Sequence, residues 1–284
     1  LWEASQIRKI HSNLYKYEKF LLKKYNLKIS QNYSRILKWS INNPNKFWST
    51  IWDFANVKGI KSTKYYKSKI LFKNRFLINS KLNFAENILS KNDNTKAITF
   101  ISENGYREVR TWKDLNLNVN KISNFFKKIN IKTNDRIAAY LPNLIETVEA
   151  FIATASIGAI WSSCSPDFGV DGVIERFKQI RPKVLIIADR YYYNGKKINI
   201  IERLPYILKK IKSIKNIIVV NYPGKKFLKF KKINKIKINQ WKEIKKIKQK
   251  KLKFKKFNFE HSLAILYSSG TTGKPKCICH RAGG

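Results

Sequence analysis

A run of nine residues, Ser268 to Lys276, combines the residue types that bind phosphate groups. Its glycines permit close backbone approach and positive φ angles, so successive N–H groups can form an anion-binding concavity. Four hydroxyl side chains, and two lysines around a proline, add donors and positive charge. The run therefore predicts a polyphosphate-binding loop, with candidate contacts Ser268, Ser269, Gly270, Thr271, Thr272, Gly273, Lys274 and Lys276.

The run differs from the Walker loop of kinases and GTPases. Ser268 stands where that pattern needs its first glycine, and Pro275 stands where it needs the magnesium-binding hydroxyl. A P-loop enzyme is therefore disfavoured. The structural alternative is an ordinary glycine-rich hairpin turn, and the two lysines argue against it.

Apolar strands alternate with amphipathic helices from residue 97 onward. Asn104-Gly105 is a strong turn pair and predicts a hairpin over residues 97–110. Thr111 with Asp114, and Asn143 with Glu146, predict the starts of two helices. The alternation indicates a parallel sheet covered by helices. Its predicted strands are residues 136–141, 159–163, 184–188, 217–220 and 263–267, and a further strand over 276–280 means that the phosphate loop joins two strands.

The first ninety residues are rich in aromatic side chains. Over residues 45–54 a helix would place Phe47, Ile51 and Phe54 on one side, as expected of core residues. Residues 82–89 predict a further short helix. The fold class is therefore α/β, with a helical N-terminal region followed by parallel sheets covered by helices.

Composition limits the class of protein. With 284 residues and 43% hydrophobic residues, the chain can hold one or two domains with a real core. It has no apolar run long enough for a bilayer and no secretory signal, which predicts a cytoplasmic protein without membrane insertion. The absence of Met, and an end just after the phosphate loop, indicate a fragment.

The net charge of +41 raises the possibility of nucleic-acid binding. Much of this charge lies between Lys209 and Lys256, and it is carried by lysine while arginine is scarce. A nucleic-acid reader more often uses arginine for bidentate contacts. Solvated surface lysine is therefore favoured, no specific nucleic-acid partner is expected, and a basic nucleic-acid-binding protein is a distant alternative.

Three cysteines, Cys164, Cys277 and Cys279, do not make a disulfide framework. Cys277 and Cys279 alternate along a predicted strand and would face the same side. They lack further metal ligands nearby, so free thiols are expected and no metal site is predicted on the chain.

The Ser268–Lys276 run, together with its flanks over residues 265–267 and 280–284, resembles the phosphate-loop signature of the adenylate-forming (AMP-binding) enzymes. These enzymes include the acyl-CoA synthetases. Within this superfamily the chain most resembles the acetoacetyl-CoA synthetases (acetoacetate–CoA ligases). The similar stretches are spread over the whole chain and comprise residues 1–2, 47–48, 51–54, 82–89, 160–169, 176–185 and 265–270.

This resemblance implies an ATP-dependent acid–thiol ligase that activates acetoacetate. The carboxylate attacks the α-phosphorus of ATP-Mg²⁺ to give an acyl-adenylate and pyrophosphate, and coenzyme A then displaces AMP. The resemblance assigns the loop residues, including Lys274 and Lys276, to the ATP phosphates. It divides the chain into an N-terminal cap, residues 1–95, and an incomplete large domain, residues 96–284. Acetyl- or propionyl-CoA synthetase is the alternative.

The resemblance places the adenine, magnesium and hinge motifs and the catalytic lysine beyond position 284, so the chain alone is expected to be inactive. It also suggests a coenzyme A contact in the segment 189–197, through Arg190 and Lys196. Tyr192 stands where an arginine is expected, and an exposed tyrosine-rich loop is the alternative. By the same resemblance His280 lies near the active centre, and a purely structural role is the alternative.

Overall fold

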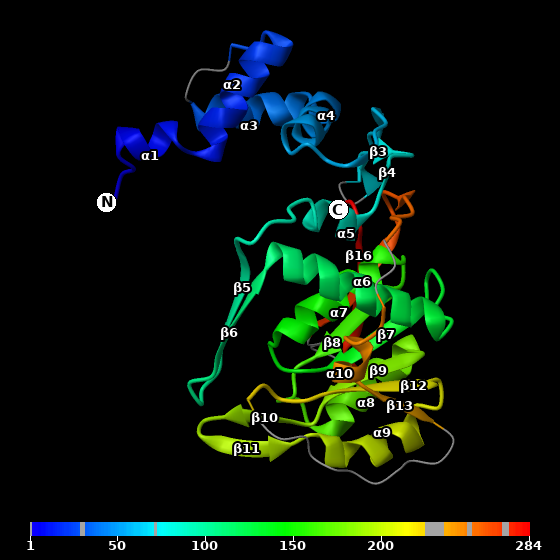
Figure 1. Ribbon diagram of the computed structural model, residues 1–284. Helices are drawn as coiled ribbons and strands as arrows, with labels where there is room; N and C mark the ends of the chain where they lie inside the picture. The colour runs from blue at the N-terminus through cyan, green and yellow to red at the C-terminus, as the bar shows by residue number, and fades with distance from the viewer. Residues whose placement is uncertain (1, 29–31, 71–72, 225–235, 249–251, 269–272) are drawn as a thin grey trace. The chain divides into compact units, whose positions relative to one another are not determined.

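The computed structural model describes residues 2–28, 32–70, 73–224, 236–248, 252–268 and 273–284 (Figure 1). The chain divides into two compact units, Leu1–Leu82 and Asn83–Gly284. Among the described residues, no helix is both long and apolar enough to span a bilayer.

The first unit is mainly helical. It contains α1 (Gln6–Ile10), α2 (Asn13–Tyr25), α3 (Tyr33–Asn42) and α4 (Pro44–Phe54). Two short antiparallel pairs follow, β1 (Gly59–Ile60) with β4 (Lys81–Leu82) and β2 (Lys64–Tyr66) with β3 (Arg75–Ile78). The predicted helix over residues 45–54 is confirmed as α4, which starts with a proline, the residue preorganised for a first helical turn. Trp52 is buried, and the Trp48 ring stacks on Phe76 with centroids 4.2 Å apart.

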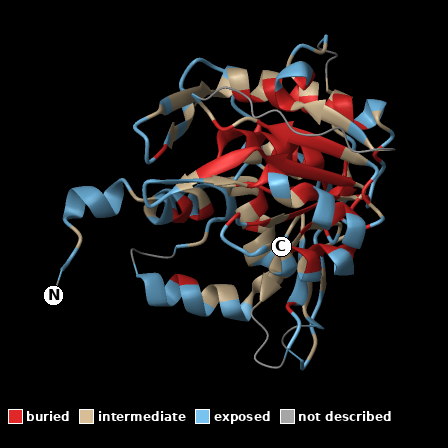
Figure 2. Cartoon of the chain, turned by 90° about the horizontal axis from the view of Figure 1, so that it is seen from below, coloured by how far each residue is buried: buried red, intermediate tan, exposed pale blue. Residues whose placement is uncertain are grey.

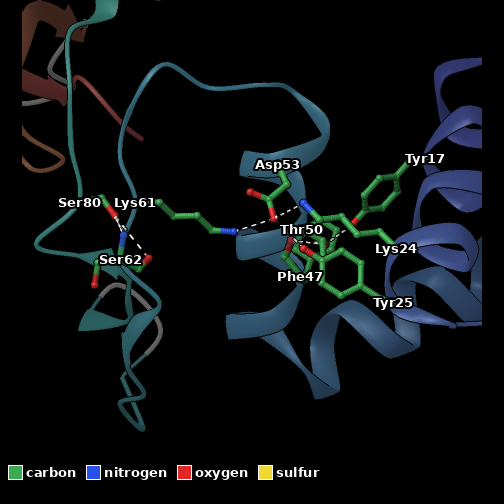
Figure 3. Close-up of polar contacts among 9 residues, drawn as sticks. All are labelled: Tyr17, Lys24, Tyr25, Phe47, Thr50, Asp53, Lys61, Ser62 and Ser80. Atoms are coloured by element: carbon green, nitrogen blue, oxygen red, sulfur yellow. Dashed lines mark hydrogen bonds and ion pairs between the residues drawn. The ribbon is translucent and has the colours of Figure 1, made fainter.

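Asp53, near the end of α4, receives three hydrogen bonds that link separate parts of the first unit (Figure 3). Its Oδ2 accepts from Tyr25 Oη at 2.6 Å, from Lys24 Nζ at 3.1 Å and from Lys61 Nζ at 2.8 Å. Burial on its own would raise the pKa of Asp53, but the hydrogen bonds from Lys61, Tyr25 and Lys24 outweigh it and lower the pKa to about 2. The ionised carboxylate therefore ties α2 and the segment after α4 to α4 itself.

We predict that Asp53→Asn destabilises this unit at pH 7 by about 1–2 kcal/mol, discounted for partial exposure. Because the folded pKa lies below its ordinary value, the stabilisation is present above about pH 4 and is lost as the pH falls through 2. Amide hydrogen exchange of α2 and α4 measures the effect, which should shrink toward pH 2. Asp171→Asn, in the other unit, is the control. Equal protection of α2 and α4 in the variant and the parent at pH 7 would contradict the prediction.

The second unit is built on a seven-stranded sheet with the order β13-β12-β9-β7-β8-β15-β16. All neighbours are parallel except β15 and β16, which are antiparallel, so the predicted parallel sheet is confirmed. All five residues of β9 are buried, as expected of a central parallel strand covered on both faces. Figure 2 shows buried strands at the centre of the sheet. The strands are β7 (Arg136–Tyr140), β8 (Ile160–Cys164), β9 (Val184–Ala188), β12 (Asn216–Val220), β13 (Lys237–Gln240), β15 (Ser262–Ser268) and β16 (Lys276–Arg281).

Helices cover both faces of this sheet (Figure 1). The chain passes from β7 through α7 (Ile145–Ser156) to β8, then back past β7 through α8 (Val170–Ile180) to β9. Parallel crossovers are right-handed as a rule, so two that move in opposite directions across the sheet place α7 and α8 on opposite faces. The helices α5 (Phe84–Ile88) and α6 (Trp112–Lys128) contact α7, and α9 (Leu204–Lys210) contacts α8. The remaining elements are η2 (Ile201–Arg203), α10 (Trp241–Ile244), which contacts α6, and β14 (Phe257–Asn258).

The structure confirms one predicted helix start and corrects the other. The hairpin of β5 (Lys96–Ile101) and β6 (Arg107–Thr111) is as predicted, and the Thr111 hydroxyl accepts from the Asp114 N–H at 3.1 Å. Asn143 is not the cap of the next helix, because α7 begins at Ile145. There the Thr147 hydroxyl accepts from the Leu144 N–H at 3.4 Å and donates to the Pro142 carbonyl at 2.8 Å.

A buried charged group joins the β5–β6 hairpin to the helices. Glu149 of α7 is fully buried, and its Oε1 accepts from Arg110 Nε at 2.9 Å and Asn118 Nδ2 at 2.7 Å. Burial raises the pKa of Glu149 to about 7, against the opposing effects of Lys245 and Arg110. Arg110 of β6 also pairs with Glu108 at 2.8 Å, and Asn118 lies on α6, so these contacts of Glu149 join the hairpin to both α6 and α7.

Candidate functional site

The predicted phosphate loop is closed by the antiparallel pair of β15 and β16. Ser268 ends β15 and pairs with Lys276, which begins β16, so the prediction that the run joins two strands is confirmed. Ser269, Gly270, Thr271 and Thr272 lie outside the described residues. Gly273, Lys274 and Lys276 are exposed. The φ of Gly273 is +125°, and a Cβ there would meet no atom within 4 Å, so conformation and not space requires glycine.

The β15 side of this stem is fixed to β8 and α8. Ser162 Oγ lies 3.0 Å from Tyr267 Oη and 2.9 Å from the Ile265 carbonyl oxygen. The guanidinium of Arg176 lies 4.1 Å from the ring centroid of Phe168 and 5.8 Å from that of Tyr267. Burial raises the pKa of Tyr267, so its hydroxyl stays protonated and hydrogen-bonded at neutral pH.

The β16 side is fixed by Gln179 of α8. Its Nε2 donates to the carbonyl oxygen of Pro275, which is buried, at 3.0 Å. Its Oε1 lies 3.6 Å from Cys277 Sγ, a weak thiol contact. One helix thus contacts both arms of the loop, although Arg176 and Gln179 precede the loop by almost a hundred residues.

We predict that Gln179→Leu loosens the stem, because it removes the donor of a partly buried hydrogen bond to the Pro275 carbonyl at a cost of about 1 kcal/mol. The amides of β16 should exchange roughly fivefold faster, as measured by hydrogen–deuterium exchange. Glu175→Gln is the matched control, since Glu175 is exposed one turn earlier on the same helix. Unchanged β16 exchange in Gln179→Leu would show that this hydrogen bond does not hold the loop.

The stem reaches the carboxyl edge of the sheet. β15 runs parallel to β8, with Ala264 opposite Trp161, so the loop leaves the same edge as the segment after β8. That segment is held in place, because Tyr140 Oη donates to the Phe168 carbonyl at 2.8 Å and Arg203 donates to Tyr140 Oη and to the Pro166 carbonyl. Ligands of open α/β sheets bind outside this edge, which makes it the expected location of the site.

The segment that carries Arg190 and Lys196 is a hairpin and not an irregular loop. β10 (Arg190–Tyr193) pairs with β11 (Lys196–Asn199) around Asn194-Gly195, whose φ angles are +49° and +69°. This is the same turn pair that identified the first hairpin, so the sequence carried a signal for it. Of the three tyrosines only Tyr193 is exposed, while Tyr192 is partly buried and Tyr191 is buried, so the expectation of an exposed tyrosine-rich loop is largely wrong.

The two candidate coenzyme A residues differ in their surroundings. Arg190 is 6% exposed, and its Nη2 donates to Asp189 Oδ2 at 2.9 Å. The other carboxylate oxygen of Asp189 accepts from the Tyr222 N–H at 2.8 Å. Lys196 is exposed at the tip of the hairpin. The structure thus places Arg190 at the base of the hairpin, in a buried ion pair, and Lys196 at its far end.

Both candidate segments leave the same edge of the sheet. The hairpin follows β9 and the phosphate loop follows β15, and only β7 and β8 lie between them. With neighbouring strands about 4.8 Å apart, the two strand ends are roughly 14 Å from each other. An extended ligand with charged groups at both ends can contact both segments.

The remaining candidate side chains lie near the stem. His280 is exposed on β16 opposite Ala264. Cys277 and Cys279 are exposed free thiols, whereas Cys164 is buried and its pKa is raised to about 12 by burial. Within the described part of the chain, no three His, Cys, Asp or Glu side chains gather as a metal site.

Comparison with known proteins places this geometry in a family. The model of the family described as AMP-binding enzyme matches residues 85–284, more than two thirds of the chain. The chain is 38% identical over 266 residues to an acetoacetyl-CoA synthetase from Xenopus tropicalis, and 35% identical over 294 residues to one from Gallus gallus. These alignments cover 89% and 100% of the chain but 39% and 43% of those proteins.

A solved structure has the same fold. An acetoacetyl-CoA synthetase from Streptomyces lividans matches with a TM-score of 0.90 at 24% identity, covering 100% of this chain and 43% of that one. The chain therefore spans about two fifths of the length of these relatives.

Proposed function

This chain belongs to the family of AMP-binding enzymes, and from that premise we propose that it is part of an ATP-dependent acid–thiol ligase that activates acetoacetate and transfers it to coenzyme A. The observation that carries the proposal is the Ser268–Lys276 run at the carboxyl end of β15, which lies inside the segment that matches the family. The chain is similar along its length to acetoacetyl-CoA synthetases, which supports acetoacetate as the acid.

The residues around the loop fit a polyphosphate. Lys274 and Lys276 are exposed at the end of the run, and Gly273 has a positive φ, which favours glycine. The adenylation half-reaction concentrates negative charge on departing pyrophosphate, which cations and preorganised donors stabilise. We assign the phosphate contacts to Ser268, Ser269, Gly270, Thr271, Thr272, Gly273, Lys274 and Lys276.

The remaining ligands follow from the same proposal. Mg²⁺ would accompany ATP as its counter-ion. Coenzyme A would contact Lys196, with the buried Arg190 at the base of the same hairpin. We further propose that residues 1–95 form an N-terminal cap and residues 96–284 part of the large domain. We also propose that the enzyme is cytoplasmic and acts in ketone-body or lipid metabolism, which suits this reaction.

We predict that a complete enzyme containing this chain exchanges pyrophosphate into ATP when acetoacetate is supplied, and does so poorly with acetate. Exchange of labelled pyrophosphate measures the adenylation half-reaction directly. Propionate serves as a second comparison acid. Equal or faster exchange with acetate or propionate would move the assignment to an acetyl- or propionyl-CoA synthetase.

In the same enzyme, Lys274→Ala and Thr272→Val should slow adenylation by about a hundredfold or more, because each removes a group directed at the polyphosphate. The thiol-transfer step from preformed acyl-adenylate should change less. Single-turnover kinetics of the two halves separate these effects. Lys113→Ala, at an exposed lysine on α6, is the control, and normal adenylation by both loop variants would show that the loop assignment is wrong.

A further inference from the structure

A basic cavity lies at the amino edge of the same sheet, opposite to the edge that carries the phosphate loop. It has a volume of about 610 Å³, and seven of its nine lining residues are lysine or arginine. Three of these stand at strand starts: Arg136 begins β7, Lys183 precedes β9 and Lys215 precedes β12. Because the strands are parallel, these starts share one edge, and the loops that follow the strands leave the other.

Backbone hydrogen bonds hold these three residues in a row. The Lys183 N–H donates to the Arg136 carbonyl at 2.9 Å, and the Lys215 N–H donates to the Lys183 carbonyl at 2.8 Å. Four further cations lie at the carboxyl ends of α8 and α9 or just after them. They are Lys178 and Arg181 at α8, and Lys210 and Lys212 at α9. The backbone of Arg136, Lys183 and Lys215 is therefore positioned by the sheet.

Little negative charge balances this cluster. Lys183 Nζ pairs with Asp135 at 2.8 Å. Arg136 donates to the carbonyls of Ile180, Asn134 and Arg181, which carry no net charge. Within the described part of the chain, the side chains of Lys178, Arg181, Lys212 and Lys215 form no ion pair.

The helix ends cannot neutralise the cluster either. The carboxyl ends of α8 and α9 contribute together at most about one negative charge. Seven cations less the one paired by Asp135 leave six, so a large positive excess remains after this correction. Ser213 also lines the cavity, and its buried Oγ has no hydrogen-bond partner among the described residues. A cavity with excess positive charge and an unused hydroxyl suits a compact, multiply charged anion.

We propose that this cavity binds an anion that carries two or more linked phosphate groups. Lysines suit phosphate as point charges, and the cavity falls within the size range of small-molecule sites. The source of the phosphates is an inorganic polyphosphate or a nucleotide. The site is separate from the phosphate loop, because the two lie at opposite edges of one sheet.

The test uses tripolyphosphate and ADP as probes on the full chain at 150 mM salt. Because the phosphate loop also suits these probes, lysine acetylation followed by mass spectrometry locates each binding event. We expect saturable protection of Lys178, Lys212 and Lys215. Stronger protection by ADP than by tripolyphosphate would identify a nucleotide as the source, and the reverse would identify a free polyphosphate; either result supports the site.

The exposed side chains of the cavity permit a matched pair of variants. Replacing Lys178, Lys212 and Lys215 with Gln should weaken binding of the probe roughly tenfold to a hundredfold. Because the replaced lysines can no longer be acetylated, protection is then measured at Lys183 and Lys210. Replacing Lys96, Lys113 and Lys127 with Gln makes the same change in net charge outside the cavity and should leave it unchanged.

Three results would overturn the proposal. The first is the absence of saturable protection at this salt concentration. The second is an equal loss of binding in the two triple variants. The third is displacement of the probe by a random RNA oligomer that protects all exposed lysines alike. That result would identify a general polyanion-binding surface instead of a phosphate site. Circular dichroism of each variant checks that its fold is intact.

Discussion

The parallel packing of β7, β9 and β12 is the constraint on which the second unit depends. Their central residues are fully buried, so each strand must be covered on both faces and each connection must cross over as a helix or long segment. It follows that every segment after a parallel strand leaves at one edge and every strand start lies at the other. The phosphate loop after β15, the 165–169 segment after β8 and the β10–β11 hairpin after β9 meet at the carboxyl edge for this reason alone. No side-chain interaction between them is needed to bring them together.

Much of this fold could be predicted from local sequence, and the failures have identifiable causes. The strands of the central sheet were visible as short apolar runs, and Asn104-Gly105 identified a hairpin because it supplies the required turn. Asn194-Gly195 offers the same signal, and its hairpin was missed because the expected role of the segment was taken from a resemblance. Asn143 was predicted to cap α7 on residue type and spacing, but the chain turns at Asn143, the extended Leu144 occupies the cap position, and Thr147 supplies the hydrogen bonds instead. The strand order could not be predicted, since apolar runs of similar length do not specify their neighbours.

The residues of the candidate site could be predicted from the sequence, but their arrangement in space could not. The Ser268–Lys276 run could be recognised because its chemistry is local, as glycine, hydroxyl and lysine must all lie in one loop to surround a phosphate group. The contacts of Gln179 with Pro275 and of Ser162 with Tyr267 join segments about a hundred residues apart, and hydrogen-bond partners at that distance leave no periodic pattern in a single sequence. The burial of Arg190 depends on Asp189 and on the fully buried strand β9 that precedes it. A charged residue beside an acidic one in sequence can be a ligand or an ion pair, and only the fold decides which.

The lysine-rich stretch shows why a high net charge is compatible with this fold. The lysines between residues 209 and 256 were expected to be solvated, and between them the chain forms β12, β13 and α10, in which Trp241 and Ile244 are 3% and 1% exposed. The neighbouring Lys242 is exposed, and a lysine at such a position keeps its ammonium in water while its methylene groups cover apolar surface. Lysine can therefore accumulate at surface positions without altering the buried pattern that determines the strand or helix. The same reasoning distinguishes scattered surface charge from a binding site. The high lysine content of the chain explains scattered surface lysines. The row at the starts of three strands is different, because backbone hydrogen bonds of the sheet fix its position.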